Sequence, residues 1–240
     1  MKLQKKKGII VLLTLAVLSC YACGKVTNQN EVQEENLNQL NEDTYRVQAD
    51  LTRNGTPETI ITSVYEVLKD SKKPAVIAVE SHGSEIVWKK EIFAYNLGEN
   101  QGNASYFLGN VDGNSCLIYY NPYIKEDKAE YSYKVFYLGQ DGSEITIAEN
   151  SISFDTAWKE NMKFPVDEMV DFAEEINEYM DKAYILLSTI DGELCYSTLD
   201  TMEVYKEHYQ LFTGNEDISS EEELRKTLNE YKSKLERNNL

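Results

Sequence analysis

The sequence predicts an α+β fold that is mainly antiparallel β, as a meander, a sandwich-like pair of sheets or part of a propeller, with two C-terminal amphipathic helices. Residues 44–155 contain short runs of alternating apolar and polar residues, separated by turn signals, and the chain is rich in tyrosine. The apolar period then becomes helical over 165–188 and 219–237. Strands that precede helices, rather than alternating with them, disfavour a parallel α/β fold.

The N-terminus has the pattern of a secretory signal peptide. Four lysines among the first seven residues precede an apolar stretch over 8–18. This stretch is about half the ~20 residues that a membrane-spanning helix needs. We therefore expect residues 1–19, or 1–22, to direct export and to be removed.

The segment after the apolar stretch indicates a lipid anchor. Val17-Leu18-Ser19-Cys20 resembles the lipobox of bacterial lipoproteins, and the resemblance implies a diacylglycerol on Cys20. Ala22-Cys23-Gly24 also resembles the start of a mature lipoprotein, so Cys23 is the alternative, and an ordinary secreted protein is a second one. A cysteine with two or three acyl chains would hold the chain stably on the outer face of a cell membrane.

The mature chain is acidic and begins with a polar segment. Without the four lysines of the signal it keeps 20 basic against 41 acidic residues, a net charge of −21. This charge argues against binding to nucleic acid. Residues 25–43 contain no aromatic residue and are dominated by Asn, Gln and Glu. We interpret residues 20–43 as the lipidated cysteine and a disordered tether, followed by a single extracytoplasmic domain over 44–240.

The predicted strands are joined by hairpin turns at 81–84, 112–114 and 140–143, of which the second and third contain an Asp-Gly pair. A first strand starts at Thr44, and the others are expected at 58–68, 74–80, 85–95, 104–111, 115–120, 131–137, 145–147, 151–154 and 193–197.

Two helices are expected after the strands. The first begins near Pro165, carries Asp167 and Glu168 at its positive end and should run to about Leu187. The second covers 219–237, with Ser219 and Glu222 spaced as a capping box. Its apolar stripe consists of Leu224, Leu228, Tyr231 and Leu235. This stripe would pack on the sheet or bind a partner.

One loop has the spacing of a calcium site. Residues 49–61 resemble a single copy of the FG-GAP repeat of integrin-type propellers, in which alternate oxygens wrap a calcium ion. The resemblance implies as ligands Asp50, Thr52, Asn54, the Thr56 carbonyl and Glu58. Thr52 and Asn54 replace carboxylates of the family pattern. A turn that keeps the shape without metal is therefore the alternative, and a full propeller would need several copies.

The two cysteines of the body, Cys116 and Cys195, lie in strand-like surroundings. They predict either a disulfide or two buried free thiols.

The sequence contains no motif typical of an enzyme active site. His82 and His208 are the only histidines, and both lie in polar connections. We therefore predict a non-catalytic binding or sensing module for a protein, peptide or glycan. The tyrosines of the 131–137 strand, Tyr131, Tyr133 and Tyr137, could stack on such a ligand. The alternatives are a structural component of an envelope complex and a carboxylate-based hydrolase.

A wider resemblance supports the location only. Residues 112–113, 131–138, 150–155 and 172–180 are similar to segments of a group of lipoproteins from clostridia, which carries no assigned activity.

Overall fold

The computed structural model describes residues 44–63, 75–92, 100–102, 104–180, 183–190, 193–195, 218 and 220–237. Within them the chain forms eleven strands and two helices, which confirms the predicted α+β, mainly antiparallel class. The elements are β1 Thr44–Ala49, β2 Glu58–Ser63, β3 Ala75–Glu80, β4 Ile86–Ile92, β5 Asn100–Gly102, β6 Ser105–Val111, β7 Asn114–Lys125, β8 Lys128–Leu138, β9 Glu144–Asp155, α1 Val166–Met180, β10 Tyr184–Ile190, β11 Glu193–Cys195 and α3 Glu221–Arg237.

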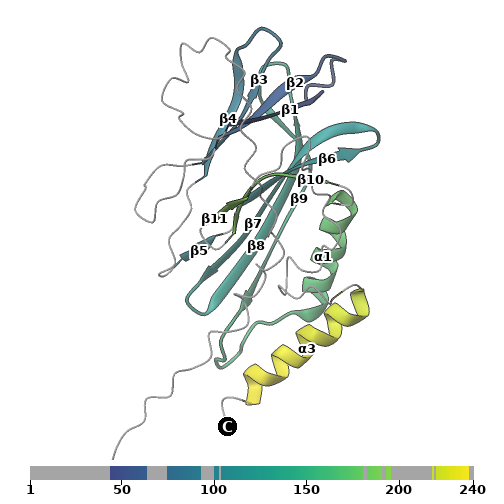
Figure 1. Cartoon of the computed structure of the whole chain (residues 1–240). Helices are drawn as coiled ribbons and strands as arrows, with labels where there is room; N and C mark the ends of the chain where they lie inside the picture. The colour runs from purple at the N-terminus through teal and green to yellow at the C-terminus, as the bar shows by residue number, and fades with distance from the viewer. Residues whose placement is uncertain are drawn as a thin grey trace, which may run out of the picture.

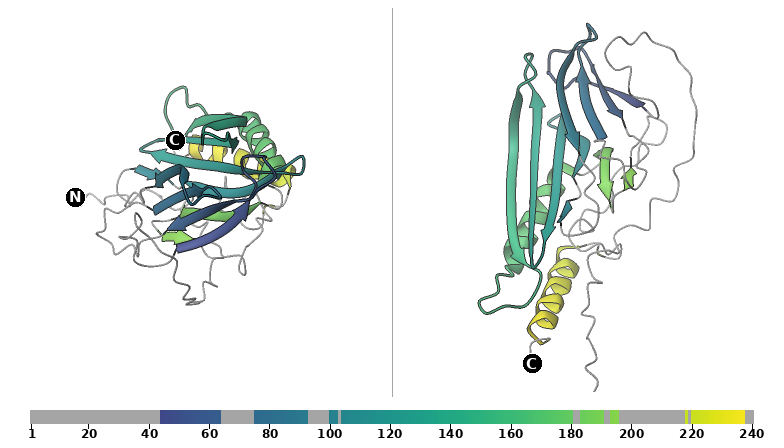
Figure 2. Two further views of the ribbon diagram at one scale, coloured as in Figure 1. Left: turned by 90° about the horizontal axis from the view of Figure 1, so that it is seen from above. Right: turned by 90° about the vertical axis from the view of Figure 1, so that its left-hand side faces the viewer.

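The elements form three layers (Figures 1 and 2). Sheet A has the order β1-β2-β3-β4, and sheet B has the order β11-β10-β6-β7-β8-β9, with β5 also paired to β7. All strand pairs are antiparallel. Sheet A packs on one face of sheet B, and the two helices cover the other face. Both sheets contain meanders, as the closely spaced turns predict.

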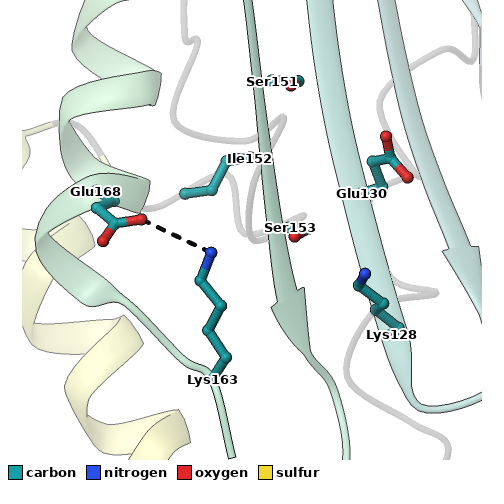
Figure 3. Close-up of a pocket in the computed structure, with 7 residues that line it drawn as sticks. All are labelled: Lys128, Glu130, Ser151, Ile152, Ser153, Lys163 and Glu168. Carbon is teal, nitrogen blue, oxygen red and sulfur yellow. Dashed lines mark ion pairs between the residues drawn. The ribbon is translucent and has the colours of Figure 1, made fainter.

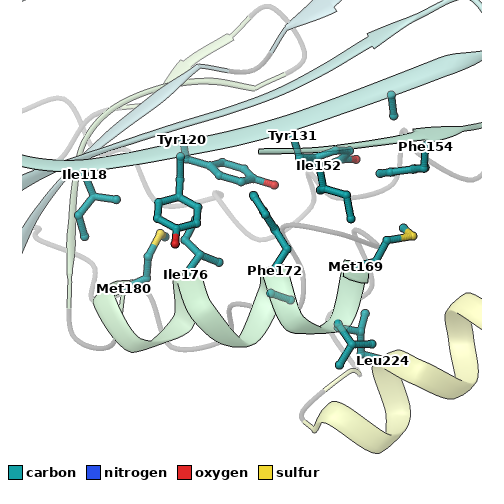
Figure 4. Packing of buried hydrophobic residues seen from close by; sticks show 14 of the residues in the cluster. Ile118, Tyr120, Tyr131, Ile152, Phe154, Met169, Phe172, Ile176, Met180 and Leu224 are labelled. Carbon is teal, nitrogen blue, oxygen red and sulfur yellow. The ribbon is translucent and has the colours of Figure 1, made fainter. Parts of the chain in front are cut away.

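Alternation along sheet B divides the buried residues into two cores. Along β8, Tyr131, Tyr133 and Val135 face the helices, whereas Phe136 and Leu138 face sheet A. Figure 4 shows the helix-side core, in which Phe172 and Ile176 of α1 point at the aromatic rings of sheet B. Successive side chains of a strand point to opposite faces, so one strand can supply both cores.

Helix α1 is shorter than predicted, and the expectation that it runs to about Leu187 is wrong. It ends at Met180, and β10 begins at Tyr184. Residues 183–187 form a continuous apolar run, in which Ile185 faces one core while Leu186 and Leu187 lie in the other. A strand that is buried on both faces has such a run, and its spacing also fits a helix.

Two strand predictions also need correction. Residues 145–147 and 151–154 belong to one long strand, β9, in which a bulge opposite Val135 and Phe136 interrupts the pairing. The hairpin of β7 and β8 is longer than expected, and it pairs as far as Lys125 and Lys128. The bulge shifts the alternation of side chains, and this hid the continuity of β9 in the sequence.

Helix α3 packs against α1. Its Leu224 and Leu228 are buried in the helix-side core, and Tyr231 and Leu235 pack at the margin of that core. The apolar stripe is thus used for packing inside the molecule. The helix is capped by Ser220, whose hydroxyl accepts a hydrogen bond from the Glu223 N–H at 3.3 Å. The predicted cap, Ser219, lies outside the described residues.

The strand order excludes a disulfide between Cys116 and Cys195. Cys116 lies in β7 and Cys195 in β11, and β6 and β10 separate these two strands. Three strand spacings of ~4.8 Å amount to about 14 Å. A disulfide requires Cα atoms within about 7 Å, so the two residues cannot pair. Burial raises the pKa of the Cys116 thiol to about 11, which keeps it protonated at neutral pH.

Candidate functional site

The loop that resembles a calcium site is closed by its own hydrogen bonds. The two carboxylate oxygens of Asp50 accept hydrogen bonds from the N–H groups of Asn54 and Gly55, at 3.1 and 2.9 Å. Glu58 is buried, and its Oε2 accepts from the N–H groups of Leu51 and Thr52 at 2.8 and 3.1 Å. Its Oε1 accepts from the Thr52 hydroxyl at 2.6 Å.

These contacts use the side-chain oxygens that the resemblance assigns to a calcium ion. The Thr52 hydroxyl and the Asn54 amide oxygen are both engaged within the loop, the latter as acceptor for the Thr56 N–H at 2.7 Å. Only Asp50 and Glu58 would bring formal charge, and the described residues contain no group of three His, Cys, Asp or Glu side chains that could hold a metal. The geometry favours the alternative, a loop that keeps the shape of the repeat without the ion.

The loop instead joins the two sheets. Leu51 is fully buried between them, and its carbonyl accepts a hydrogen bond from the Leu138 N–H at 3.0 Å. The guanidinium of Arg53 lies 3.7 Å from the ring centroid of Tyr137. We conclude that the hydrogen bonds of Glu58 order the loop, and that the ordered loop connects sheet A to the end of β8 through Leu51 and Arg53.

We predict that Glu58→Gln lowers the free energy of unfolding by about 1–3 kcal/mol, because an amide nitrogen would replace one of the two accepting oxygens of a buried group. Urea unfolding measures the effect. Thr56→Ala is the control, because it changes the same loop without removing a hydrogen bond of Glu58. The melting temperature should be the same in millimolar calcium and in EDTA, because only an ion that binds the folded state raises it. A calcium-dependent rise would contradict the hydrogen-bonded loop.

Two of the three tyrosines predicted to bind a ligand lie in the core. Tyr131 and Tyr133 are each 2% exposed, so their rings are not available to a ligand at the surface, and the prediction that they bind one is wrong. Tyr131 stacks on Phe154, and Tyr133 meets Phe172 edge to face. Burial raises the pKa of both phenols. Tyr137 is half-buried beneath Arg53.

The histidines contribute no site within the described part of the chain. His82 is exposed in the turn between β3 and β4, and His208 lies outside the described residues.

A charged cluster sits at the corner where β4 and β9 approach. Glu144 accepts a hydrogen bond from the Trp88 indole N–H at 2.9 Å, and it pairs with Lys90 at 3.0 Å and Lys134 at 2.6 Å. Burial favours the protonated form of Glu144. The hydrogen bonds from Lys134, Trp88 and Lys90 outweigh this and lower its pKa to about 2. The cluster therefore links the sheets as a charged group.

We predict that Glu144→Gln lowers the free energy of unfolding at pH 7 by about 1–3 kcal/mol, because two lysines and an indole lose their charged acceptor. The folded-state pKa is depressed, so this stabilisation is complete above the ordinary value of 4.5 and is lost as the pH falls towards about 2. Urea unfolding of both proteins from pH 7 to pH 2 measures the difference. A constant difference, or an equal loss in the exposed control Glu236→Gln, would contradict this role.

Sheet A covers only one end of sheet B, the upper end in Figure 1. Towards the other end, the same side of sheet B is polar. Sheet A packs on Leu117, Phe136 and Leu138 near the top of the long strands. Further down, β7, β8 and β9 carry polar side chains on this side, which we call the polar face: Asn121, Lys128, Glu130, Ser132, Lys134, Glu149, Ser151 and Ser153. The strand register aligns Asn121, Ser132 and Ser151 in one row. Adjacent strands thus present matched hydrogen-bonding groups.

A pocket of about 230 Å³ lies where the polar face meets the edge of β9 (Figure 3). Its lining residues are Lys128, Glu130, Ser151, Ile152, Ser153, Lys163 and Glu168. Lys163 extends along β9, and its Nζ lies 4.0 Å from Glu168 of α1. Two lysines, two glutamates and two serines can bind a ligand that has hydrogen-bonding groups and charges of both signs. The pocket and the adjoining polar face together are the candidate binding site.

The prediction based on the tyrosines of β8 missed the polar residues that alternate with them, although the sequence shows this alternation. Lys128, Glu130 and Ser132 alternate with the buried Ala129 and Tyr131. The polar members of an alternating strand point away from the core. The sequence did not show whether a second sheet covers them.

Among the described residues, neither helix is long and apolar enough to cross a lipid bilayer. Comparison of the chain with family models, with curated proteins and with solved structures finds no match.

Proposed function

We propose that this chain is a lipid-anchored, extracytoplasmic binding module without catalytic activity, which holds a polar ligand on the polar face and in the adjacent pocket. The observation that carries the proposal is the row-by-row alignment of hydroxyl, amide and charged groups on β7, β8 and β9. These groups sit on long paired strands that are backed by the helix-side core. A rigid support lowers the entropic cost of binding.

The ligand class follows from the chemistry of the site. Serine and asparagine side chains both donate and accept hydrogen bonds, and Lys128 and Glu130 add opposite charges. Peptides, protein segments and glycans that carry charged groups all satisfy this description. Nucleic acid does not, because the net charge of the chain is −17.

The binding proposal can be tested by NMR on the ¹⁵N-labelled domain. Envelope extracts, separated into peptide and glycan pools, should shift the amides of β8 and β9 near Glu130 and Ser151. Glu130→Arg should abolish the shifts, and the matched variant Glu236→Arg, on exposed α3, should keep them. The proposal fails if neither pool shifts these amides, or if the shifts lie on sheet A.

The anchor is proposed on Cys20, with Cys23 as the alternative. A lipid on either residue would leave the polar segment up to residue 43 between the membrane and β1. In cells given labelled palmitate, Cys20→Ser should lose the label and leave the membrane fraction, whereas Cys23→Ser should keep both. The reverse result would move the anchor to Cys23. Label in neither parent nor variants would contradict lipid attachment.

A further inference from the structure

We propose that the pocket takes an extended peptide segment, which adds to the free edge of β9 as a further strand of sheet B. This inference rests on the proposed binding function and narrows its ligand to a peptide. Three observations support it: the direction of the backbone groups of β9, the limits of its free edge, and the charges beside that edge.

The backbone of β9 presents hydrogen-bonding groups away from β8. Among the described strands it ends the order of sheet B and pairs only with β8. The Asp155 N–H donates to the Lys163 carbonyl at 2.7 Å, so it points outwards. In an antiparallel pair the outward direction recurs at every second residue. The N–H and C=O groups of Ser153 therefore also point outwards, beside the pocket that Ser153 lines.

The free part of the edge has defined ends. At its lower end Lys163 already bonds to Asp155 as an added strand would, and the Asp155 carboxylate accepts the Lys163 N–H at 2.5 Å. At its upper end Asn150 Nδ2 donates to Glu175 of α1 at 2.5 Å. The Ser151 N–H is also engaged, because it donates to Asn150 Oδ1 at 2.7 Å. The outward groups between these contacts are therefore the Ser151 carbonyl and the N–H and carbonyl of Ser153, and residues 151–153 span about 10 Å at ~3.3 Å per residue. An extended segment of about three residues fits this length.

The charges beside the edge suit a peptide of mixed charge. Side chains of an added strand would alternate between the polar face, with Lys128 and Glu130, and the α1 side, with Glu168. No aromatic ring is among the described residues that line the pocket, so it offers no stacking platform for a sugar. Outward backbone groups at strand spacing match a peptide backbone and give affinity through main-chain hydrogen bonds.

The probe for this proposal is the peptide acetyl-Lys-Ser-Glu-Ser-Lys-Ser-Glu-amide, titrated into the ¹⁵N-labelled domain. We expect a shift of the Ser153 amide signal and slower hydrogen exchange at that amide. Ser153→Pro removes the outward N–H and leaves the bonds to β8 intact, so it should weaken binding by about tenfold or more. Ser153→Ala, the matched comparison, keeps the outward N–H and removes only the hydroxyl, so it should weaken binding clearly less than Ser153→Pro does.

A second probe leaves the protein unchanged. N-methylation of the central amides of the peptide keeps its charges and blocks strand pairing, so it should abolish the shifts at Ser153. The proposal is overturned if the methylated peptide binds equally well, if Ser153→Pro has no effect, or if the unmodified peptide leaves the Ser153 amide unchanged at millimolar concentration. If a glycan pool still shifts the amide signals of the polar face, the proposed binding function is supported and only the peptide ligand is ruled out. If no pool shifts them, both proposals are ruled out.

Discussion

Phe172→Ala should lower the free energy of unfolding by about 3–5 kcal/mol, the usual cost of emptying the space of a buried phenylalanine. Phe172 is 2% exposed and lies in the helix-side core (Figure 4). Its ring centroid is 5.4 Å from that of Tyr133. The ring fills the layer between α1 and β8, which the surrounding backbone cannot close by a small shift. Urea unfolding, followed by tryptophan fluorescence, measures the loss.

The neighbouring residue Asp171 supplies the control. It is exposed on the same helix, and Asp171→Ala should change the free energy of unfolding by less than about 0.5 kcal/mol. A loss below about 1 kcal/mol for Phe172→Ala would mean that α1 does not depend on this core, and the three-layer arrangement would then be in doubt.

Gly142→Ala should cost about 3 kcal/mol or more, whereas Gly113→Ala should cost only about 1–2 kcal/mol. Both glycines lie in hairpin turns with positive φ, +78° at Gly142 and +81° at Gly113. They differ in their surroundings. A Cβ at Gly142 would lie 1.9 Å from the Val87 carbonyl oxygen of β4, and a Cβ at Gly113 would meet nothing within 4 Å.

The difference between the two variants therefore reports the contact between the β8–β9 turn and sheet A. Thermal unfolding of both variants, measured side by side, gives this difference without the backbone term that they share. Equal losses would show that the turn does not rest on β4. Together with the Glu144→Gln result, this comparison separates two contributions to stability where β4 meets the β8–β9 turn: the close packing at Gly142 and the ion pairs of Glu144.

Much of the fold was predictable because its signals are local. The Asp-Gly pairs at 112–113 and 141–142 fix two hairpins, and the alternation on either side fixes which residues enter a core. The start of α1 was equally clear, since Pro165 and two acidic residues mark it. Its end was not, because the apolar run over 183–187 fits a helix as well as a strand, and it becomes a strand only through burial between two layers.

The candidate site was less predictable than the fold. Tyr131 and Tyr133 suggested binding by their chemistry alone, but whether a strand face meets helices or solvent depends on elements distant in the chain. The serines and charges of the polar face are ordinary in sequence. Their significance comes from the register with neighbouring strands and from the limited reach of sheet A.

The connectivity of sheet B also governs how quickly the molecule can form. Strands of sheet A and of the β6–β9 meander each pair with the next strand along the chain, whereas β10 returns to β6, where Tyr184 meets Leu108 from 76 positions earlier. Contacts so distant in the chain form slowly. Until they do, β6 is an unprotected edge on which another copy could nucleate aggregation, so we expect the arrival of β10 to be the late, rate-limiting step of folding.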